Sequence, residues 1–282
     1  MMEYERPAFI SPSTPRMDSR MLEVKRPAVI IPRIPQDVIH EILDHLVDSD
    51  LRSLQACALV SKSWIPSCRR HIFHTVDLTS GMMDRWFDTF PVPEESPAHH
   101  VRGLRVSFEG VDWFPDKFFE HAPQFTNVQG LFLLQGSCCP VARLPSLWRL
   151  PESVTSLTIG AGGVGLVEIW DIMARLPNLD NFSLYGSYIP ADRRELLGTG
   201  TVPKGRFTGK LLLYGTQHAS GDVTNMLLEI PTGLHFTHVV ISCAPRCLPS
   251  VIRLVEACCK TIVKLSLEID FYGKPDPFSS SG

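Results

Sequence analysis

The sequence of 282 residues predicts an α/β protein in which a small three-helix unit precedes a curved solenoid with parallel strands. Two observations support this fold class. Between residues 34 and 70, apolar side chains recur at helical spacing. From residue 72 onward, pairs of apolar residues separated by one position recur at a nearly constant step, which indicates an internal repeat.

The composition is that of a globular protein, with 44% hydrophobic and 20% charged residues. The 27 Lys and Arg against 30 Asp and Glu leave a net charge of −3, so no basic excess indicates a nucleic-acid or membrane partner. No apolar run approaches the roughly 20 residues that cross a bilayer, and the amino-terminal residues lack the order of a signal peptide. Eight cysteines are too few for a disulfide scaffold. We therefore expect a soluble cytoplasmic or nuclear protein with free thiols.

Order is expected to begin near residue 31, after a disordered leader over residues 1–30 that is rich in Pro, Ser, Arg and Met. The first helix follows, because its apolar residues form one stripe. Pro35 suits the first helical turn, and Asp37 suits the positive end of the helix. The apolar positions are Ile34, Val38, Ile39, Ile42, Leu43 and Leu46.

Two further short helices are expected before residue 72. Asp50 is a plausible cap for the second, and residues 61–70, which carry Trp64 and Cys68, form the third. Three short helices bury few apolar side chains, so we expect contacts with a partner or with the chain that follows to stabilise this unit.

The period-2 pattern then repeats eight times, with steps of 28, 27, 26, 25, 29, 28 and 26 residues between successive pairs. A period in the twenties with one such strand per unit is typical of leucine-rich-repeat solenoids. The pairs are Val76/Leu78, Leu104/Val106, Leu131/Leu133, Leu157/Ile159, Phe182/Leu184, Leu211/Leu213, Val239/Ile241 and Leu265/Leu267.

Helical segments between these strands would return the chain to start each parallel strand. Residues 166–176 and 248–259 are the clearest, and residues 82–90, 114–122 and 222–230 are weaker. The repeats are degenerate, because the Asn that usually follows the strand and forms a ladder is missing from nearly every unit. We place the leucine-rich-repeat-like solenoid at residues 73–272 and a flexible tail at residues 273–282.

The segment 34–74 resembles an F-box domain, particularly that of fungal F-box proteins in which a degenerate leucine-rich region follows at once. The segment departs from the usual pattern by having Ile at position 34 and a slightly different loop around residues 47–49. We place the domain at residues 31–72. The matching residues are Ile34-Pro35, Val38, Ile42-Leu43, Leu46, Asp50-Leu51, Leu54 and Leu59-Val60-Ser61-Lys62-x-Trp64.

This resemblance implies a substrate-recognition subunit of an SCF-type cullin–RING ubiquitin ligase. The F-box would dock on a Skp-type adaptor, and the solenoid would hold a substrate protein. Such a subunit is not itself an enzyme, because it acts by holding a lysine near a thioester. The adaptor-facing residues carried over are Ile34, Pro35, Val38, Ile39, Leu43, Leu51 and Trp64.

Two other functions are compatible with the sequence. The helical unit could merely cap the solenoid, leaving a protein-interaction module that acts outside ubiquitination. Residues 160–165 match the GxGxxG of a dinucleotide-binding turn between a strand and a helix, which would fit an oxidoreductase. The next strand, however, ends in Gly186-Ser187-Tyr188, where an acidic residue for the ribose should stand.

No metal, cofactor or catalytic constellation is predicted. His40 and His45 are five residues apart, about 140° around a helix, and cannot share a metal on one face. His238 and Cys243 lie on opposite faces of a predicted strand.

A substrate surface is predicted on the concave side of the solenoid. If the apolar pairs point inward, alternate residues of each strand face outward. Aromatic residues at the centre of these rows would act as binding hot spots. The candidates are Arg105, Phe132, Leu134, Tyr185, Leu212 and Tyr214.

Overall fold

The structure is a computed structural model, and it describes most of the chain between residues 34 and 270. The predicted leader and tail lie outside the described residues. The described ranges are 34–47, 51–107, 116–134, 151–160, 165–186, 202–214 and 220–270.

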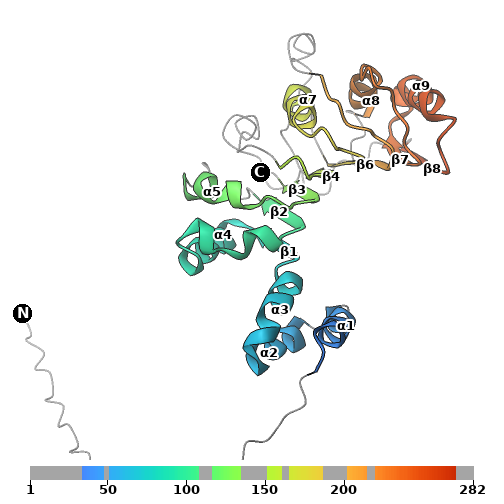
Figure 1. Ribbon diagram of the computed structural model, residues 1–282. Helices are drawn as coiled ribbons and strands as arrows, with labels where there is room; N and C mark the ends of the chain where they lie inside the picture. The colour runs from blue at the N-terminus through green and yellow to red at the C-terminus, as the bar shows by residue number, and fades with distance from the viewer. Residues whose placement is uncertain are drawn as a thin grey trace, which may run out of the picture.

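Three helices and a short 3-10 turn form a compact unit at one end of the molecule (Figure 1). Their apolar sides meet in a small core of Ile39, Leu43, Leu54 and Cys68. The elements are α1 (Gln36–Val47), α2 (Leu51–Val60), η1 (Lys62–Trp64) and α3 (Ile65–Ile72).

In the described part of the chain, eight parallel strands follow in one sheet, and each strand pairs with its sequence neighbours. This arrangement confirms the predicted fold class, and every predicted apolar pair lies in the expected strand. The strands are β1 (Thr75–Leu78), β2 (Gly103–Ser107), β3 (Gly130–Leu134), β4 (Ser156–Gly160), β5 (Asn181–Tyr185), β6 (Lys210–Tyr214), β7 (His238–Cys243) and β8 (Lys264–Ile269).

The pairing register aligns the repeats as the pattern predicted. The first members of the eight apolar pairs form one continuous row across the sheet, from Val76 opposite Leu104 to Val239 opposite Leu265. In β1 to β7 both members of each pair are buried and form the main core. The pair in β8 is the exception, because both of its leucines remain exposed.

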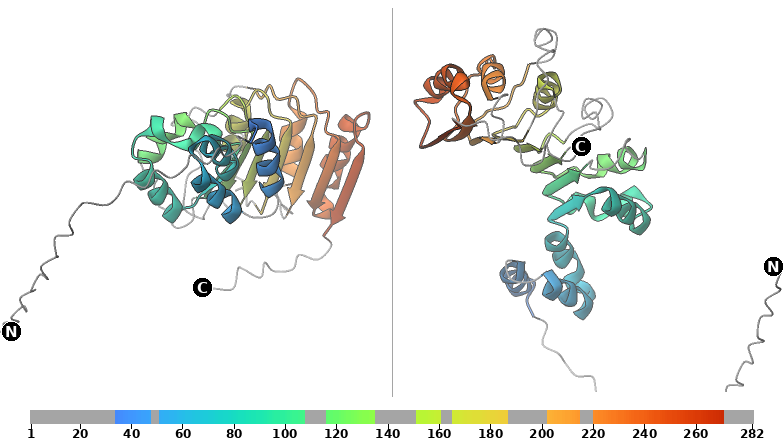
Figure 2. Two further views of the ribbon diagram at one scale, coloured as in Figure 1. Left: turned by 60° about the horizontal axis from the view of Figure 1, so that its bottom comes forward. Right: turned by 180° about the vertical axis from the view of Figure 1, so that it is seen from behind.

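Helices and short 3-10 turns return the chain between strands and lie on the outside of the arc, while the sheet lines its inner side (Figures 1 and 2). The helical return segments predicted from the sequence are therefore confirmed. The elements are α4 (Ser80–Thr89), η2 (Pro93–Glu95), η3 (Pro97–His100), α5 (Asp116–His121), η4 (Ala122–Gln124), α7 (Leu166–Ala174), α8 (Ser220–Leu228), η7 (Pro245–Cys247) and α9 (Leu248–Cys258).

Side chains three residues before the strands form a ladder between the middle repeats. Each side chain donates a hydrogen bond to a backbone carbonyl of the preceding repeat. This ladder precedes the strand, whereas the Asn ladder typical of leucine-rich repeats follows it. The pairs are Asn127 to His99, Ser153 to Thr126 and Asn178 to Glu152, with donor–acceptor distances of 2.7, 3.1 and 2.8 Å.

The ladder predicts that Asn178→Ala lowers the free energy of unfolding by about 1 kcal/mol, because a carbonyl loses its side-chain donor. Urea denaturation measures the change. Asn225, exposed on α8, is a matched control, and its alanine variant should be as stable as the parent. Equal effects of the two substitutions would contradict a structural role for the ladder.

The helical unit joins the solenoid through Phe73, the first residue after α3. Its ring packs edge-on against Trp86 and Phe90 of the first repeat, with centroid separations of 5.9 and 6.0 Å. Ile72, the preceding residue, packs on the helical core instead. The two cores therefore meet between these neighbouring residues, which couples the orientation of the helical unit to the first repeat.

Candidate functional site

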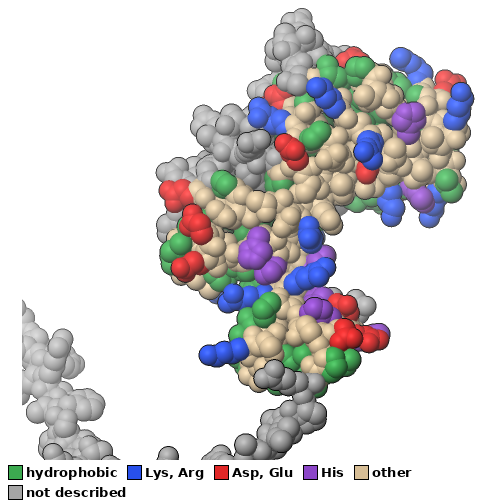
Figure 3. Space-filling view, viewed as in Figure 1, with side chains coloured by type: hydrophobic (Ala, Val, Ile, Leu, Met, Phe, Trp, Pro, Cys, Tyr) green, Lys and Arg blue, Asp and Glu red, His purple; other side chains and the backbone are tan. Residues whose placement is uncertain are grey.

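Helix α1 presents an apolar line to solvent. Val38 and Ile42 are four residues apart on one side of the helix, and Ile34 precedes Val38 by four residues, just before the helix begins. All three side chains are exposed and form what we call the exposed line of α1. Pro35 is exposed beside them, and Leu51 is exposed at the start of α2. Hydrophobic side chains are visible on the surface of this unit at the bottom of Figure 3.

Ile39 and Leu43, which the sequence predicts to face an adaptor, do not belong to the exposed line of α1. Both are buried, Leu43 to 0% exposure, in the core that α1 shares with Leu54 and Cys68. They fall about 100° around the helix from the exposed line, and this is the side that α2 and α3 cover. Their role is therefore to hold α1 in place, so they are left out of the candidate surface.

The carboxyl-terminal end of α2 adds apolar side chains to the surface. Leu59 is 88% exposed, and Val60 beside it is also exposed. The sequence motif contained both residues, yet gave them no contact role. Their spacing could have indicated this exposure, because they fall outside Leu54, Cys57 and Ala58, the positions at which α2 packs on the helical core.

Trp64 is half-buried against the helical core rather than fully displayed. Ser61 positions it, because the Ser61 hydroxyl accepts a hydrogen bond from the Ser63 amide and caps the 3-10 turn. The tight turn between α2 and α3 thus places the indole beside the core, with part of its surface facing solvent.

Polar contacts fix α1 against α3. The His71 Nε2 atom lies 3.1 Å from the Asp44 carboxylate, and the Gln36 amide donates to the Ser67 hydroxyl at 3.5 Å. Burial lowers the pKa of His71, and the nearby Asp44 carboxylate only partly offsets it. These contacts orient the exposed line of α1 relative to the rest of the unit.

The comparison with protein families agrees with this geometry. Residues 31–76 match the F-box domain family. The chain contains an F-box domain. In general terms, an F-box domain indicates an adaptor role in SCF-type ubiquitin ligases, in which the domain binds a Skp-type protein. No curated protein matches the chain.

Beyond the F-box domain, the inner face of the sheet places two predicted side chains next to each other. Tyr185 of β5 and Tyr214 of β6 are paired in register, both are exposed, and their ring centroids are 6.5 Å apart. Two adjacent exposed aromatic rings suit recognition of a peptide, because each offers a large apolar face and a hydroxyl.

A second group lies nearer the F-box domain. The Arg105 guanidinium lies over the Phe132 ring, 5.6 Å from its centroid, and 3.4 Å from the Asp77 carboxylate. Leu134, on the same strand as Phe132, and Leu212, on the same strand as Tyr214, are half-buried. All six predicted substrate residues therefore belong to the outward rows of the sheet, with the tyrosines the most apolar exposed part.

The glycine-rich segment after β4 has a packing role at its described ends. A Cβ on Gly160 would meet the Leu134 side chain at 2.6 Å, so the glycine makes room for a neighbouring repeat. The Glu168 carboxylate lies against Gly165, where α7 begins. A negative charge there disfavours the pyrophosphate that a dinucleotide site would place at this helix end. Residues 161–164 lie outside the described residues.

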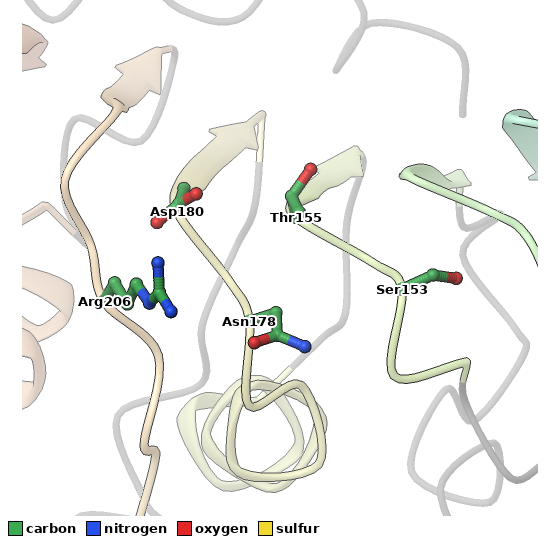
Figure 4. A pocket seen from close by; sticks show the side chains of 5 residues that line it. All are labelled: Ser153, Thr155, Asn178, Asp180 and Arg206. Carbon is green, nitrogen blue, oxygen red and sulfur yellow. The ribbon is translucent and has the colours of Figure 1, made fainter.

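A hollow of about 190 Å³ lies where the chain enters β4 and β5 (Figure 4). Most of its polar side chains already have protein partners. The Asp180 carboxylate accepts a hydrogen bond from Thr208, and Asn178 and Ser153 belong to the ladder. The hollow therefore belongs to the contacts between repeats.

Within the described ranges, no group of three or more His, Cys, Asp or Glu side chains could hold a metal ion, and no helix has the length and apolar character to cross a bilayer. The cysteines in these ranges are free, and burial raises the thiol pKa of Cys68, Cys243 and Cys258.

Proposed function

We propose that this chain is the substrate-recognition subunit of an SCF-type cullin–RING ubiquitin ligase. The F-box domain would dock on the Skp-type adaptor, and the inner face of the solenoid would hold a protein substrate. One observation supports the docking most strongly. The exposed line of α1 and the buried line beside it are separate, so the domain folds around Leu43 while Ile34, Val38 and Ile42 remain free.

The packing at Phe73 supports the proposal that the F-box domain binds the adaptor while the solenoid binds the substrate. A ligase subunit of this kind accelerates ubiquitin transfer by placing a substrate lysine near the charged enzyme, so the distance between its two binding surfaces matters. Packing of Phe73 on Trp86 and Phe90 gives the F-box domain a defined orientation on the solenoid. We also propose a cytoplasmic or nuclear location, which the free cysteines suit.

Co-purification tests the proposal. The full chain is expressed in cells with the proteasome blocked, and the captured proteins are identified by mass spectrometry. We expect a Skp-type adaptor and a cullin with the full chain, and neither with a chain lacking residues 31–72. Capture of solenoid partners without an adaptor would instead favour an interaction module outside ubiquitination.

The adjacent rings of Tyr185 and Tyr214 allow a prediction about substrate binding. We expect Tyr185→Ala with Tyr214→Ala to reduce capture of the solenoid's partner proteins by at least about tenfold, because aromatic hot spots contribute about 2 kcal/mol or more. Adaptor capture should be unchanged, since both residues lie in the solenoid. Quantitative mass spectrometry of the two captures measures the ratio. Unchanged partner capture would place the substrate surface elsewhere.

A further inference from the structure

Strand β8 is the outermost strand that the structure describes, with β7 on one side and no described strand on the other (Figure 2, left). Its leucines align with the buried pair of β7, yet Leu265 is 43% and Leu267 41% exposed, and Val263 is 79% exposed. A bare sheet edge with exposed apolar side chains is a template for pairing with another strand.

The backbone of β8 has hydrogen-bonding groups available along this edge. The amides of Lys264 and Asp270 each bond to the β7 side at 3.0 Å, to the carbonyls of Thr237 and Cys243. In a parallel pair such contacts alternate along the strand, so residues 264, 266, 268 and 270 face β7. The N–H and C=O groups of residues 265, 267 and 269 therefore point to the open side.

The sequence around this strand, Val-Lys-Leu-Ser-Leu-Glu-Ile over residues 263–269, is complementary to itself in the antiparallel direction. When two copies pair about Ser266, Leu265 lies opposite Leu267 of the second copy. These are odd-numbered residues, whose backbone groups are free, so they form the hydrogen-bonded pairs. Ser266 lies opposite its own copy in a pair that is not hydrogen-bonded, where Cα atoms are about 4.5 Å apart.

The charges favour the same pairing. Lys264 and Glu268 are four residues apart on one extended strand, about 13 Å, which is too far for them to pair with each other. In the antiparallel pairing, each Lys264 lies directly opposite Glu268 of the second copy, so two ion pairs form across the two-fold axis. Opposite charges at such positions stabilise a sheet, and like charges destabilise it.

We propose that β8 is a self-association surface, on which two copies of this chain pair antiparallel through residues 263–269 about a two-fold axis at Ser266. The two eight-stranded sheets then continue into each other, and the leucine rows of both copies meet on one face. The F-box domain lies at the other end of the arc (Figure 1), so both copies remain able to bind adaptor. This surface is separate from the proposed ligase role.

Sedimentation velocity of the full chain over a range of concentrations tests the proposal. We expect a reversible dimer that Glu268→Lys and Lys264→Glu each weaken by at least about tenfold, because each change replaces two attractive pairs by two repulsive ones. Combining both changes restores attraction and recovers the dimer. Lys260→Glu, an exposed charge reversal in the turn before β8, is the matched control and leaves the dimer unchanged.

A disulfide reports the register directly. Ser266→Cys is expected to give a cross-linked dimer on mild oxidation, since the Cα separation at this pair suits a disulfide. Glu268→Cys, four residues from its own copy in this register, is not. A monomer at every concentration, a dimer insensitive to the charge reversals, or equal cross-linking at both positions would each overturn the proposal. Adaptor capture by these variants is measured separately, so a failure here is distinct from a failure of the ligase role.

Discussion

Val38→Asp is expected to weaken binding of a Skp-type adaptor by at least about 2 kcal/mol, roughly thirtyfold in Kd. Val38 lies at the middle of the exposed line on α1, between Ile34 and Ile42, where an aspartate would put an unpaired charge into an apolar contact. Since the side chain is exposed in the free chain, the variant should remain folded. Calorimetric titration with purified adaptor measures the change.

Ile252→Asp provides the matched control. Ile252 is an exposed apolar residue on the outside of α9, in the solenoid and away from the F-box domain. The same change of side chain should therefore leave adaptor affinity as it is in the parent. Similar losses for the two variants would mean that the exposed line of α1 is not the docking surface.

Leu43→Ala is expected to lower the free energy of unfolding of the helical unit by about 2–5 kcal/mol. Leu43 is fully buried, and among the described residues its core has three other buried side chains, Ile39, Leu54 and Cys68, so its removal leaves a cavity at the centre of a small core. Such a loss is large for so small a core. Limited proteolysis with mass spectrometry should show new cleavage between residues 36 and 72.

Leu59→Ala is the control for this substitution, because it makes the same chemical change at an almost fully exposed side chain on α2. We expect its proteolysis pattern to match that of the parent. If Leu43→Ala also resisted cleavage and lost only adaptor binding, Leu43 would belong to the docking surface, as the sequence pattern suggested.

The strands could be predicted because their signal is both local and repeated. An apolar pair such as Leu157 and Ile159 fits one buried face of a strand, and its recurrence at a nearly constant step requires neighbouring strands to align. The side-chain ladder could not be predicted from the sequence, because its residue type is not constant. Asn127 and Asn178 occupy the same position of their repeats, but Ser153 takes this position in the repeat between them, so no single residue type marks the ladder.

The spacing of the apolar residues in and before α1 could not predict which of them are exposed and which are buried. Ile34, Val38 and Ile42 form one line and Ile39 and Leu43 another, and both lines are apolar. Only the positions of α2 and α3 decide which line is covered, and these positions depend on contacts between segments distant in sequence. The exposure of β8 is a similar case, because its pattern is the same as that of the seven buried strands.

Hydrogen–deuterium exchange of the full chain, with and without a purified Skp-type adaptor, tests the central claim most directly. The account predicts that adaptor slows amide exchange in α1 and α2 and leaves the inner face around Tyr185 and Tyr214 unchanged. Equal exchange in α1 and α2 with and without adaptor, or slowing confined to the solenoid strands, would contradict it.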